Sequence, residues 1–293
     1  MRILICSDGT DPADHPTRLG GMVAQATRAS VTLLGIAETP VDEEPLRAAL
    51  ESEVAFLRSL SLAPELRLRA GEPIAQTFEE TTAAKYDLVV IGAPRKRTSG
   101  LHWRAERTYE LIKAIPPPVL VATGSSNVLK SLLVCTGGKQ YIEDAVKLTG
   151  SVAVSVGASV TLLHVMAEPP AIFTDLVRLE EDVDALLASG SELGRNLKAQ
   201  KESLEKLGVR AEVRVRHGLV LDEIFREVRT ANHDLIVTGS SRARGALRHY
   251  IMGDVTREIV NRASIPVLVA RAGTFGSANG LWSSLKSLFG AGS

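Results

Sequence analysis

The sequence has little cysteine, few aromatic residues and no excess of charge of either sign. Its two cysteines, Cys6 and Cys135, are too few for a disulfide framework or a thiolate zinc site. Aromatic residues make up 4% of the chain, which disfavours a platform that stacks the bases of single-stranded nucleic acid. The 34 basic and 34 acidic residues cancel, so the basic surface of a nucleic-acid-binding protein is not expected.

Long hydrophobic runs are also missing. No stretch of about 18 consecutive apolar residues occurs, so no membrane-spanning helix is predicted. The apolar run at residues 3–6 is too short for the core of a secretory signal, and we expect a cytoplasmic protein. The remaining composition, 45% apolar and 23% charged over 293 residues, is typical of a globular protein with one large domain or two smaller ones.

The chain contains two copies of one sequence unit. The matching segments follow the same order in both copies, which indicates a tandem duplication of one domain rather than a solenoid. The offset between matches rises from 129 to 147, and this places an 18-residue insertion in the second copy, between Met166 and Val209. The matching segments are residues 3–7 and 132–136, 30–34 and 159–163, 86–92 and 233–239, and 118–122 and 266–270.

The duplication predicts two domains and a tail. We place the first domain at residues 1–124 and the second at residues 128–272, separated by a short polar junction. Residues 273–293 form a Gly/Ser-rich tail, in which the apolar residues of 281–289 share one helical face. This segment is too short to be a stable helix alone. It either docks on a partner or a membrane surface, or lies back on the second domain as a frayed end.

Each copy alternates short apolar runs with amphipathic helical patterns. Residues 88–91 are continuously apolar, as expected for a strand covered on both faces. Because strands that alternate with helices return by crossovers, we predict two doubly wound α/β domains, each a parallel sheet with helices on both faces. Cys6 and Cys135 are repeat equivalents at the ends of first strands and are expected to be small buried residues. The predicted strands are residues 2–7, 30–37, 64–69, 87–92 and 118–122, then 130–136, 158–166, 209–216, 234–239 and 266–271; the predicted helices are residues 13–29, 43–60, 73–84 and 104–114, with 173–188 and 191–207 in and after the insertion.

The ends of the first, second and fourth strands are the places to look for a ligand. In open α/β sheets, ligands bind beyond the carboxyl ends of the strands, where the strand order reverses. The segments at those ends are rich in glycine, hydroxyl and charged residues. The candidate binding residues are Ser7, Asp8, Gly9, Thr10, Ile36, Gly92 and Arg95 in the first copy, and Thr136, Gly137, Val165, Thr238, Gly239, Ser240, Arg242, Gly245, Gly253, Asp254 and Val255 in the second.

These segments resemble the universal stress protein family. The resemblance is carried by residues 8–10 after the first strand, the run at 87–92, the Arg/Gly loop and helix that follow, and the strand at 118–122. It covers nearly the whole chain twice, about residues 1–123 and 130–271. It implies a five-stranded parallel sheet of order 3-2-1-4-5 in each copy and a stress-response role.

The resemblance also implies a ligand. ATP-binding members of the family carry Gly-x2-Gly-x9-Gly-Ser/Thr after the fourth strand and an Asp, near the adenosine, at the end of the first. Glycines let backbone N–H groups approach phosphates, and the last Gly-Ser/Thr opens a helix whose N-terminus attracts anions. The expected ligand is ATP, ADP or AMP, with Mg²⁺ as a bridge between phosphate and acid; the absence of any cofactor stays open.

The second copy departs from that motif in four places. Gly239 and Gly253 are 14 residues apart, where the motif needs 13. Ala243 stands nearest the middle glycine, and Asp254 occupies the Ser/Thr position. We assign the position of the strand-one Asp to Thr136, which has no carboxylate.

The first copy departs differently. Gly92 and Ala105 have the right spacing of 13, and Asp8 is kept, but Arg95 replaces the middle glycine and Glu106 the Ser/Thr. We expect Glu106 and Asp254 to lie at helix N-termini, as a first-turn acid and an N-cap respectively. A carboxylate about 4 Å from a phosphate charge would cost ~1 kcal/mol in water and ~4 kcal/mol at an effective dielectric constant near 20. Basic residues that offset this repulsion are Lys96, Arg97, Arg104 and Arg107 in the first copy, and Arg242, Arg244, Arg248 and Arg257 in the second.

Catalysis is not expected. No Gly-x-Ser-x-Gly elbow supplies a hydrolase nucleophile, and the six histidines include no i, i+4 pair for a metal. His164 is expected in the core or at a strand end, and His233, which precedes a strand, is expected to be exposed. Residues 136–138 partly resemble the phosphate loop of ATP-pyrophosphatases, but Gln140 and Tyr141 stand where that loop has Asp and Ser. Slow ATP hydrolysis stays open, since it needs no dedicated base.

Two functional interpretations follow. The first is a regulatory protein that binds an adenine nucleotide weakly through degenerate sites. The second is an interaction scaffold for protein partners, in which both ligand sites have decayed. In either case we expect the last strands, which follow residues 116–118 and 265–266, to pair with each other. The two domains would then form within one chain the dimer that single-domain members form, and a further homodimer stays open.

Overall fold

A computed structural model describes residues 1–9, 15–93, 101–124, 128–138, 143–166, 183–242, 250–251 and 253–271. The first half contains β1 (Arg2–Ser7), α1 (His15–Thr27), β2 (Ser30–Ala37), a 3-10 turn η1 (Pro40–Asp42), α2 (Glu43–Ser59), β3 (Glu65–Ala70), α3 (Pro73–Ala83), β4 (Leu88–Gly92), α4 (Leu101–Ala114) and β5 (Val119–Ala122). The second half contains β6 (Ser131–Cys135), α5 (Glu143–Val156), β7 (Ser159–Met166), α7 (Val183–Ala188), α8 (Glu192–Glu205), β8 (Ala211–His217), α9 (Val220–Ala231), β9 (Leu235–Arg242), β10 (Tyr250–Ile251), α10 (Asp254–Arg262) and β11 (Val267–Arg271).

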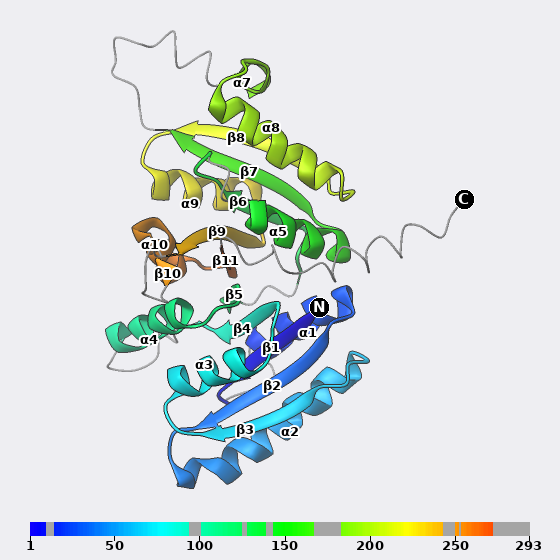
Figure 1. Ribbon diagram of the computed structural model, residues 1–293, viewed down its shortest axis with the longest axis vertical. Helices are drawn as coiled ribbons and strands as arrows, with labels where there is room; N and C mark the ends of the chain where they lie inside the picture. The colour runs from blue at the N-terminus through cyan, green and yellow to red at the C-terminus, as the bar shows by residue number, and fades with distance from the viewer. Residues whose placement is uncertain are drawn as a thin grey trace, which may run out of the picture.

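The strands form one continuous sheet of two matching halves (Figure 1). The order is β3-β2-β1-β4-β5 in the first half and β8-β7-β6-β9-β11 in the second, with β10 paired to β9 off this path. Each half therefore has the predicted order 3-2-1-4-5, and its strands run parallel. The prediction that the last strands pair is also confirmed, because β5 and β11 are antiparallel neighbours with Leu120 opposite Leu268.

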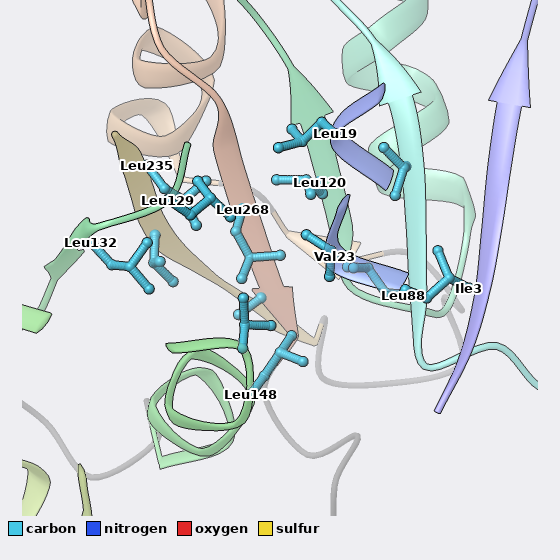
Figure 2. Close-up of a cluster of buried hydrophobic side chains, with 14 of the residues drawn as sticks. Ile3, Leu19, Val23, Leu88, Leu120, Leu129, Leu132, Leu148, Leu235 and Leu268 are labelled. Atoms are coloured by element: carbon cyan, nitrogen blue, oxygen red, sulfur yellow. The ribbon is translucent and has the colours of Figure 1, made fainter. Parts of the chain in front are cut away.

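Two apolar layers cover the sheet, and both run across the β5–β11 pair. Figure 2 shows Leu19 and Val23 of α1 and Leu148 of α5 gathered around Leu120 and Leu268. On the other face α4 and α10 contribute to the second layer. Burying one such side chain is worth about 1.5–3 kcal/mol, so the two halves share a core rather than sitting side by side. We call the β5–β11 pair, with α1 and α5 on one face and α4 and α10 on the other, the seam.

The elements differ from the predicted ones mainly near the fourth strands. Helix α4 begins at Leu101, three residues earlier than expected, and β9 continues to Arg242 instead of ending at residue 239. Of the helix expected at residues 173–188 the structure describes only α7. Residues 125–127 of the junction and 272–293 of the tail lie outside the described residues.

The two cysteines are half-buried residues near the ends of β1 and β6. Burial raises the pKa of both thiols to about 12, so the reactive thiolate is scarce at neutral pH. This fits their expected role as small packing residues. None of the helices in the described ranges is long and apolar enough to cross a membrane.

Candidate ligand site at the strand ends

The turn after the first strand has the same geometry in both halves. Ser7 Oγ accepts a hydrogen bond from the N–H of Gly9 at 3.0 Å, and Thr136 Oγ1 accepts one from the N–H of Gly138 at 3.1 Å. Both glycines have left-handed φ values, +70° and +72°. A Cβ on Gly9 would lie 2.9 Å from Leu46 of α2, so this close approach also requires glycine.

This matched turn corrects the alignment of the two copies. Ser7 and Thr136 are equivalent because each hydroxyl holds the same turn. The residue that follows Thr136, and therefore corresponds to Asp8, is Gly137. The expectation that Thr136 occupies the strand-one Asp position is wrong by one residue. The second half lacks the carboxylate at this edge all the same, because Gly137 has no side chain.

A buried polar side chain lies beneath each turn. In the first half Glu53 of α2 is 1% exposed, and its carboxylate accepts hydrogen bonds from Ser7 Oγ, at 2.5 Å, and from Thr17 Oγ1. In the second half the matching residue of α8 is Gln200, whose amide oxygen accepts from Thr136 Oγ1 at 3.1 Å. Glu53 thus connects β1, α1 and α2 at the carboxyl edge of the sheet, where a ligand would bind.

The start of α10 is an open helix N-terminus. Gly253 is its N-cap, and this glycine has no side chain with which to cap the helix. Asp254 is the first helical residue instead of the expected N-cap, and it is exposed. Thr256, in the same turn, is buried and donates to the carbonyl of Gly239 at 3.0 Å, with its hydroxyl 2.8 Å from that of Thr238. The helix start is therefore tied directly to the end of β9.

Space is free around both glycines of this region. A Cβ built on Gly239 or on Gly253 would meet no atom of the described residues within 4 Å. Both residues are exposed, and neither has a left-handed φ. The glycines are therefore not required by the packing or by the backbone conformation. An open approach to backbone N–H groups is the feature that phosphate sites use glycine to provide.

The loop expected after β9 is partly a strand. Ser241 and Arg242 pair antiparallel with Ile251 and Tyr250, and Ser240 pairs with Arg271 of β11. The backbone groups that these pairings use are not available to a phosphate. The predicted end of this strand at residue 239 is therefore wrong, because Ser240, Ser241 and Arg242 continue the sheet.

Helix α4 of the first half does not begin with the expected acid. Gly92 ends β4, and a Cβ there would meet only Pro16, at 3.8 Å. Because α4 begins at Leu101, Ala105 and Glu106 lie in its second turn. The expectation that Glu106 occupies the N-terminus is wrong, since the helix forms three residues before the predicted start.

The other candidate residues fall at the carboxyl ends of their strands or outside the described ranges. Ile36 and Val165 lie one residue before the ends of β2 and β7, and Val255 follows Asp254 in α10. His164 Nδ1 is 2.9 Å from the carbonyl oxygen of Thr136, which confirms its strand-end role. Thr10, Arg95 and Gly245 lie outside the described residues, as do Ala243, Arg244, Arg248 and residues 94–100.

Sequence reasoning missed a pair of buried carboxylates. Glu80 of α3 and Glu227 of α9 are each 0% exposed and are 147 residues apart, the repeat offset. Arg67 and Arg69 of β3 bind Glu80 at 2.7 and 2.8 Å, and the hydroxyl of Tyr86 donates to it at 2.7 Å. Burial would raise the pKa of Glu80, but these hydrogen bonds and charges hold it below the usual range.

The second carboxylate is held by an equivalent pair of arginines, with other changes around it. Arg214 and Arg216 of β8 bind Glu227, and His233 takes the place of Tyr86, with Nε2 3.5 Å from the carboxylate. His233 is 4% exposed and its Nδ1 is 2.8 Å from Ser131 Oγ, so the expectation that it is exposed is wrong. The Arg-x-Arg pattern of β3 and β8 at the repeat offset was the available sequence signal.

The described side chains at the strand ends supply hydroxyls, glycine N–H groups and one exposed acid in each half. Across the described ranges no group of three or more His, Cys, Asp or Glu residues could hold a metal ion. The half-buried thiols pack against an apolar layer, and the carboxylates of Glu80 and Glu227 lie in ion pairs. Groups of this kind can hydrogen-bond to a small polar ligand.

Comparisons with known proteins find one family that this chain resembles. The Universal stress protein family model matches residues 129–271. The universal stress protein Slr1230 of Synechocystis is 23% identical, over 92% of this chain and 99% of its own length. The universal stress protein MJ0531 of Methanocaldococcus jannaschii is 24% identical, over 52% of this chain and 87% of its own. The crystal structure of a universal stress protein from Archaeoglobus fulgidus has a TM-score of 0.68 at 14% identity and covers 93% of this chain and 98% of that one.

The three kinds of comparison agree along the chain. The family model covers the second half, the Synechocystis relative spans both halves, and the Archaeoglobus structure shares the fold over nearly the whole length. The first half repeats the strand order of the second. The second half therefore belongs to the universal stress protein family, and the first half repeats its fold in tandem.

Proposed function

We propose that this protein is a stress-response regulator that binds an adenine nucleotide weakly, with the phosphates at the carboxyl edge of the second half. The family accounts for the stress-response role. The nucleotide is the ligand that the motif resemblance implies, and the site is the open N-terminus of α10 beside Gly239. The first half keeps Asp8, the residue that the family places near the adenosine, at its own strand end.

The observation that carries this proposal is the uncapped start of α10. Its N-cap, Gly253, has no side chain and so offers no acceptor of its own to the first N–H groups of the helix. Gly239 and Gly253 keep the approach free of side chains. Such a helix start favours a negatively charged group through both its N–H groups and its dipole.

Asp254 sets the affinity of this site. As an exposed acid in the first turn it stabilises α10 through the helix dipole, and it repels a phosphate bound at the same place. At about 4 Å the repulsion would cost ~1 kcal/mol in water and up to ~4 kcal/mol where water is partly excluded. We therefore expect dissociation constants in the high micromolar to millimolar range.

The test is calorimetric titration with ATP, ADP, AMP and cyclic AMP, with and without Mg²⁺. Asp254→Ser is expected to tighten binding about tenfold because it removes the repulsion. Gly239→Val is expected to abolish binding, because the added side chain fills the approach while the local packing and backbone conformation tolerate it.

Gly92→Val is the matched control in the first half. A side chain there also has room, with only Pro16 near it. Binding that survives Gly92→Val and is lost in Gly239→Val supports the second half as the phosphate site. Loss in Gly92→Val alone would move the site to the first half.

The alternative is a scaffold that binds protein partners and no nucleotide. The specific observation in its favour is the extension of β9, which places Ser240, Ser241 and Arg242 in strand pairings instead of a phosphate loop. No binding below millimolar concentration for any nucleotide, in the unmodified protein and in Asp254→Ser alike, would reject the nucleotide proposal in favour of the scaffold.

A further inference from the structure

The seam has an approximate twofold axis. Leu120 and Leu268 lie directly opposite one another in the antiparallel β5–β11 pair, and they are repeat equivalents because they stand 148 residues apart. The pairs on either side are Val119 with Val269 and Val121 with Val267, which are also exchanged by that offset. A surface with twofold symmetry is complementary to itself. Two first halves, or two second halves, could therefore pair through it as readily as a first half with a second half.

One residue pair near the axis breaks this symmetry. The guanidinium carbon of Arg257, on α10, lies 5.0 Å from the centre of the Tyr109 ring, on α4. These residues are also 148 apart, so each faces its own repeat equivalent across the seam. Lys113 of α4 contacts the same ring, at 5.0 Å, and is paired with Glu110 at 3.2 Å. A cation over an aromatic ring is attractive, whereas two guanidinium groups in these positions repel.

A second pair breaks the symmetry away from the axis. Arg271, at the end of β11, is 1% exposed and crosses to the first half. It donates to the carbonyls of Ile112, Ile115 and Pro117, at the C-terminal end of α4, with 3.1 Å to each of the last two. A cation there satisfies carbonyls that a helix leaves unpaired.

The repeat equivalent of Arg271 is much smaller. It is Thr123, whose buried hydroxyl has no hydrogen-bond partner in the structure. Gly124 comes next, with a left-handed φ of +73°, and a Cβ there would lie 2.3 Å from the carbonyl oxygen of Ser264. The first half therefore meets the end of α10 by close backbone approach, while the second half meets the end of α4 with an arginine.

We propose that these two substitutions make the seam specific for unlike halves. Two first halves would bring together two Tyr109 rings and leave the carbonyls at both α4 ends without Arg271. Two second halves would bring together two Arg257 guanidinium groups. Only the pairing of first with second half has the attractive contact and the filled carbonyl site, so specificity comes from repulsion as well as attraction. The β5 and β11 strands of one chain therefore pair with each other, and a second copy of the protein does not bind through either strand.

The test compares full-length variants by hydrogen exchange and by light scattering. Tyr109→Arg, which places like charges at the axis, is expected to speed exchange of the β5 and β11 amides about tenfold. Arg257→Tyr removes the same attraction without adding repulsion, and is expected to speed exchange less than about threefold. The double variant, with both residues exchanged, is expected to return to within about threefold of the unmodified protein.

Arg271→Thr and Thr123→Arg provide an independent pair. Arg271→Thr is expected to speed exchange at the end of α4, because three carbonyls lose their donor. The unmodified protein is expected to be a monomer by light scattering, with β5 and β11 protected at every concentration. Equal exchange in Tyr109→Arg and Arg257→Tyr, no recovery in the double variant, or a dimer that forms as β5 and β11 become protected would overturn the proposal.

Discussion

The two halves keep the same buried ion pairs and differ beneath their first turns. Glu80 and Glu227 occupy equivalent positions, and each is held by two arginines from the neighbouring edge strand. Glu53 and Gln200 are also equivalent, but one is an acid that accepts from the hydroxyls of Ser7 and Thr17, and the other is an amide that accepts from the hydroxyl of Thr136. The residue that matches Thr17 in the second half is Val146, which has no hydroxyl.

The comparison distinguishes residues that the fold requires, which both halves keep, from residues at the strand ends, which differ between the halves. The Glu80 and Glu227 clusters join a helix to an edge strand, and a buried carboxylate without its cations would be costly, so both partners must change together. The side chains beneath the turns lie at the edge where ligands bind in this type of sheet, and there the halves have diverged.

The largest effect is expected from removing a conserved cluster charge. Glu227→Gln leaves Arg214 and Arg216 facing a buried neutral amide, and we expect the free energy of unfolding to fall by about 3 kcal/mol. Glu80→Gln should cost the same, because its surroundings match. Glu79→Gln is the control: its side chain is 60% exposed beside Arg69, so the expected change is below about 0.5 kcal/mol. Urea unfolding measures all three, and a large difference between the two buried variants would show that equal geometry hides unequal energetics.

A smaller effect is expected from making the second half resemble the first. Gln200→Glu places a buried carboxylate beside the hydroxyl of Thr136, and we expect a loss of about 2 kcal/mol. Adding Val146→Thr supplies the second hydroxyl and should recover about half of that loss. The reverse change, Glu53→Gln, keeps acceptor and donor capacity for Ser7 and Thr17 and should cost less than about 1 kcal/mol. If Gln200→Glu were neutral, the missing hydroxyl would not explain why this half carries an amide.

Most of the fold could be predicted because two signals coincide. The apolar runs mark the strands, and the repeat supplies the same pattern twice, so strand starts such as Arg2 and Ser30 agree with the prediction. The end of β9 could not be predicted, because Ser241 and Arg242 have no strand pattern and are held by pairing with Ile251 and Tyr250. Pairing between segments of a loop leaves no periodic trace in either segment.

The candidate site was harder to predict than the fold. Its strand ends follow from topology, which is why Ser7 and Gly239 fall at the expected edge. The burial of His233 depends on Ser131 and Glu227, which belong to β6 and α9, and neither contact is visible in the residues around it. The carboxylate–arginine clusters were missed for the same reason. Charged residues in an amphipathic pattern are expected to face solvent, and the sequence alone does not show that opposite charges from two elements meet.

The smallest effect concerns His233, which stands where the first cluster has Tyr86. Burial lowers the pKa of His233 below its ordinary value of 6.5, despite the carboxylate of Glu227 beside it. The unfolded chain therefore takes up a proton at pH values where the folded chain does not. The stability that neutral His233 contributes is present above about pH 6.5 and is lost as the pH falls below it. Tyr86 does not take up a proton in this pH range, so the first half has no matching loss of stability.

His233→Tyr copies the first half into the second and should flatten this part of the pH profile. Between pH 7.5 and pH 5.5 we expect the melting temperature of the variant to fall by roughly 2 °C less than that of the unmodified protein. His164→Gln is the control, because that histidine lies at a strand end and contacts Thr136 instead of a carboxylate. Below pH 4.5 both proteins should lose stability alike, since the lowered pKa values of Glu80 and Glu227 require protons to be taken up on unfolding. An unchanged profile in His233→Tyr would mean that the exchange of tyrosine for histidine leaves the two clusters energetically equivalent across neutral pH.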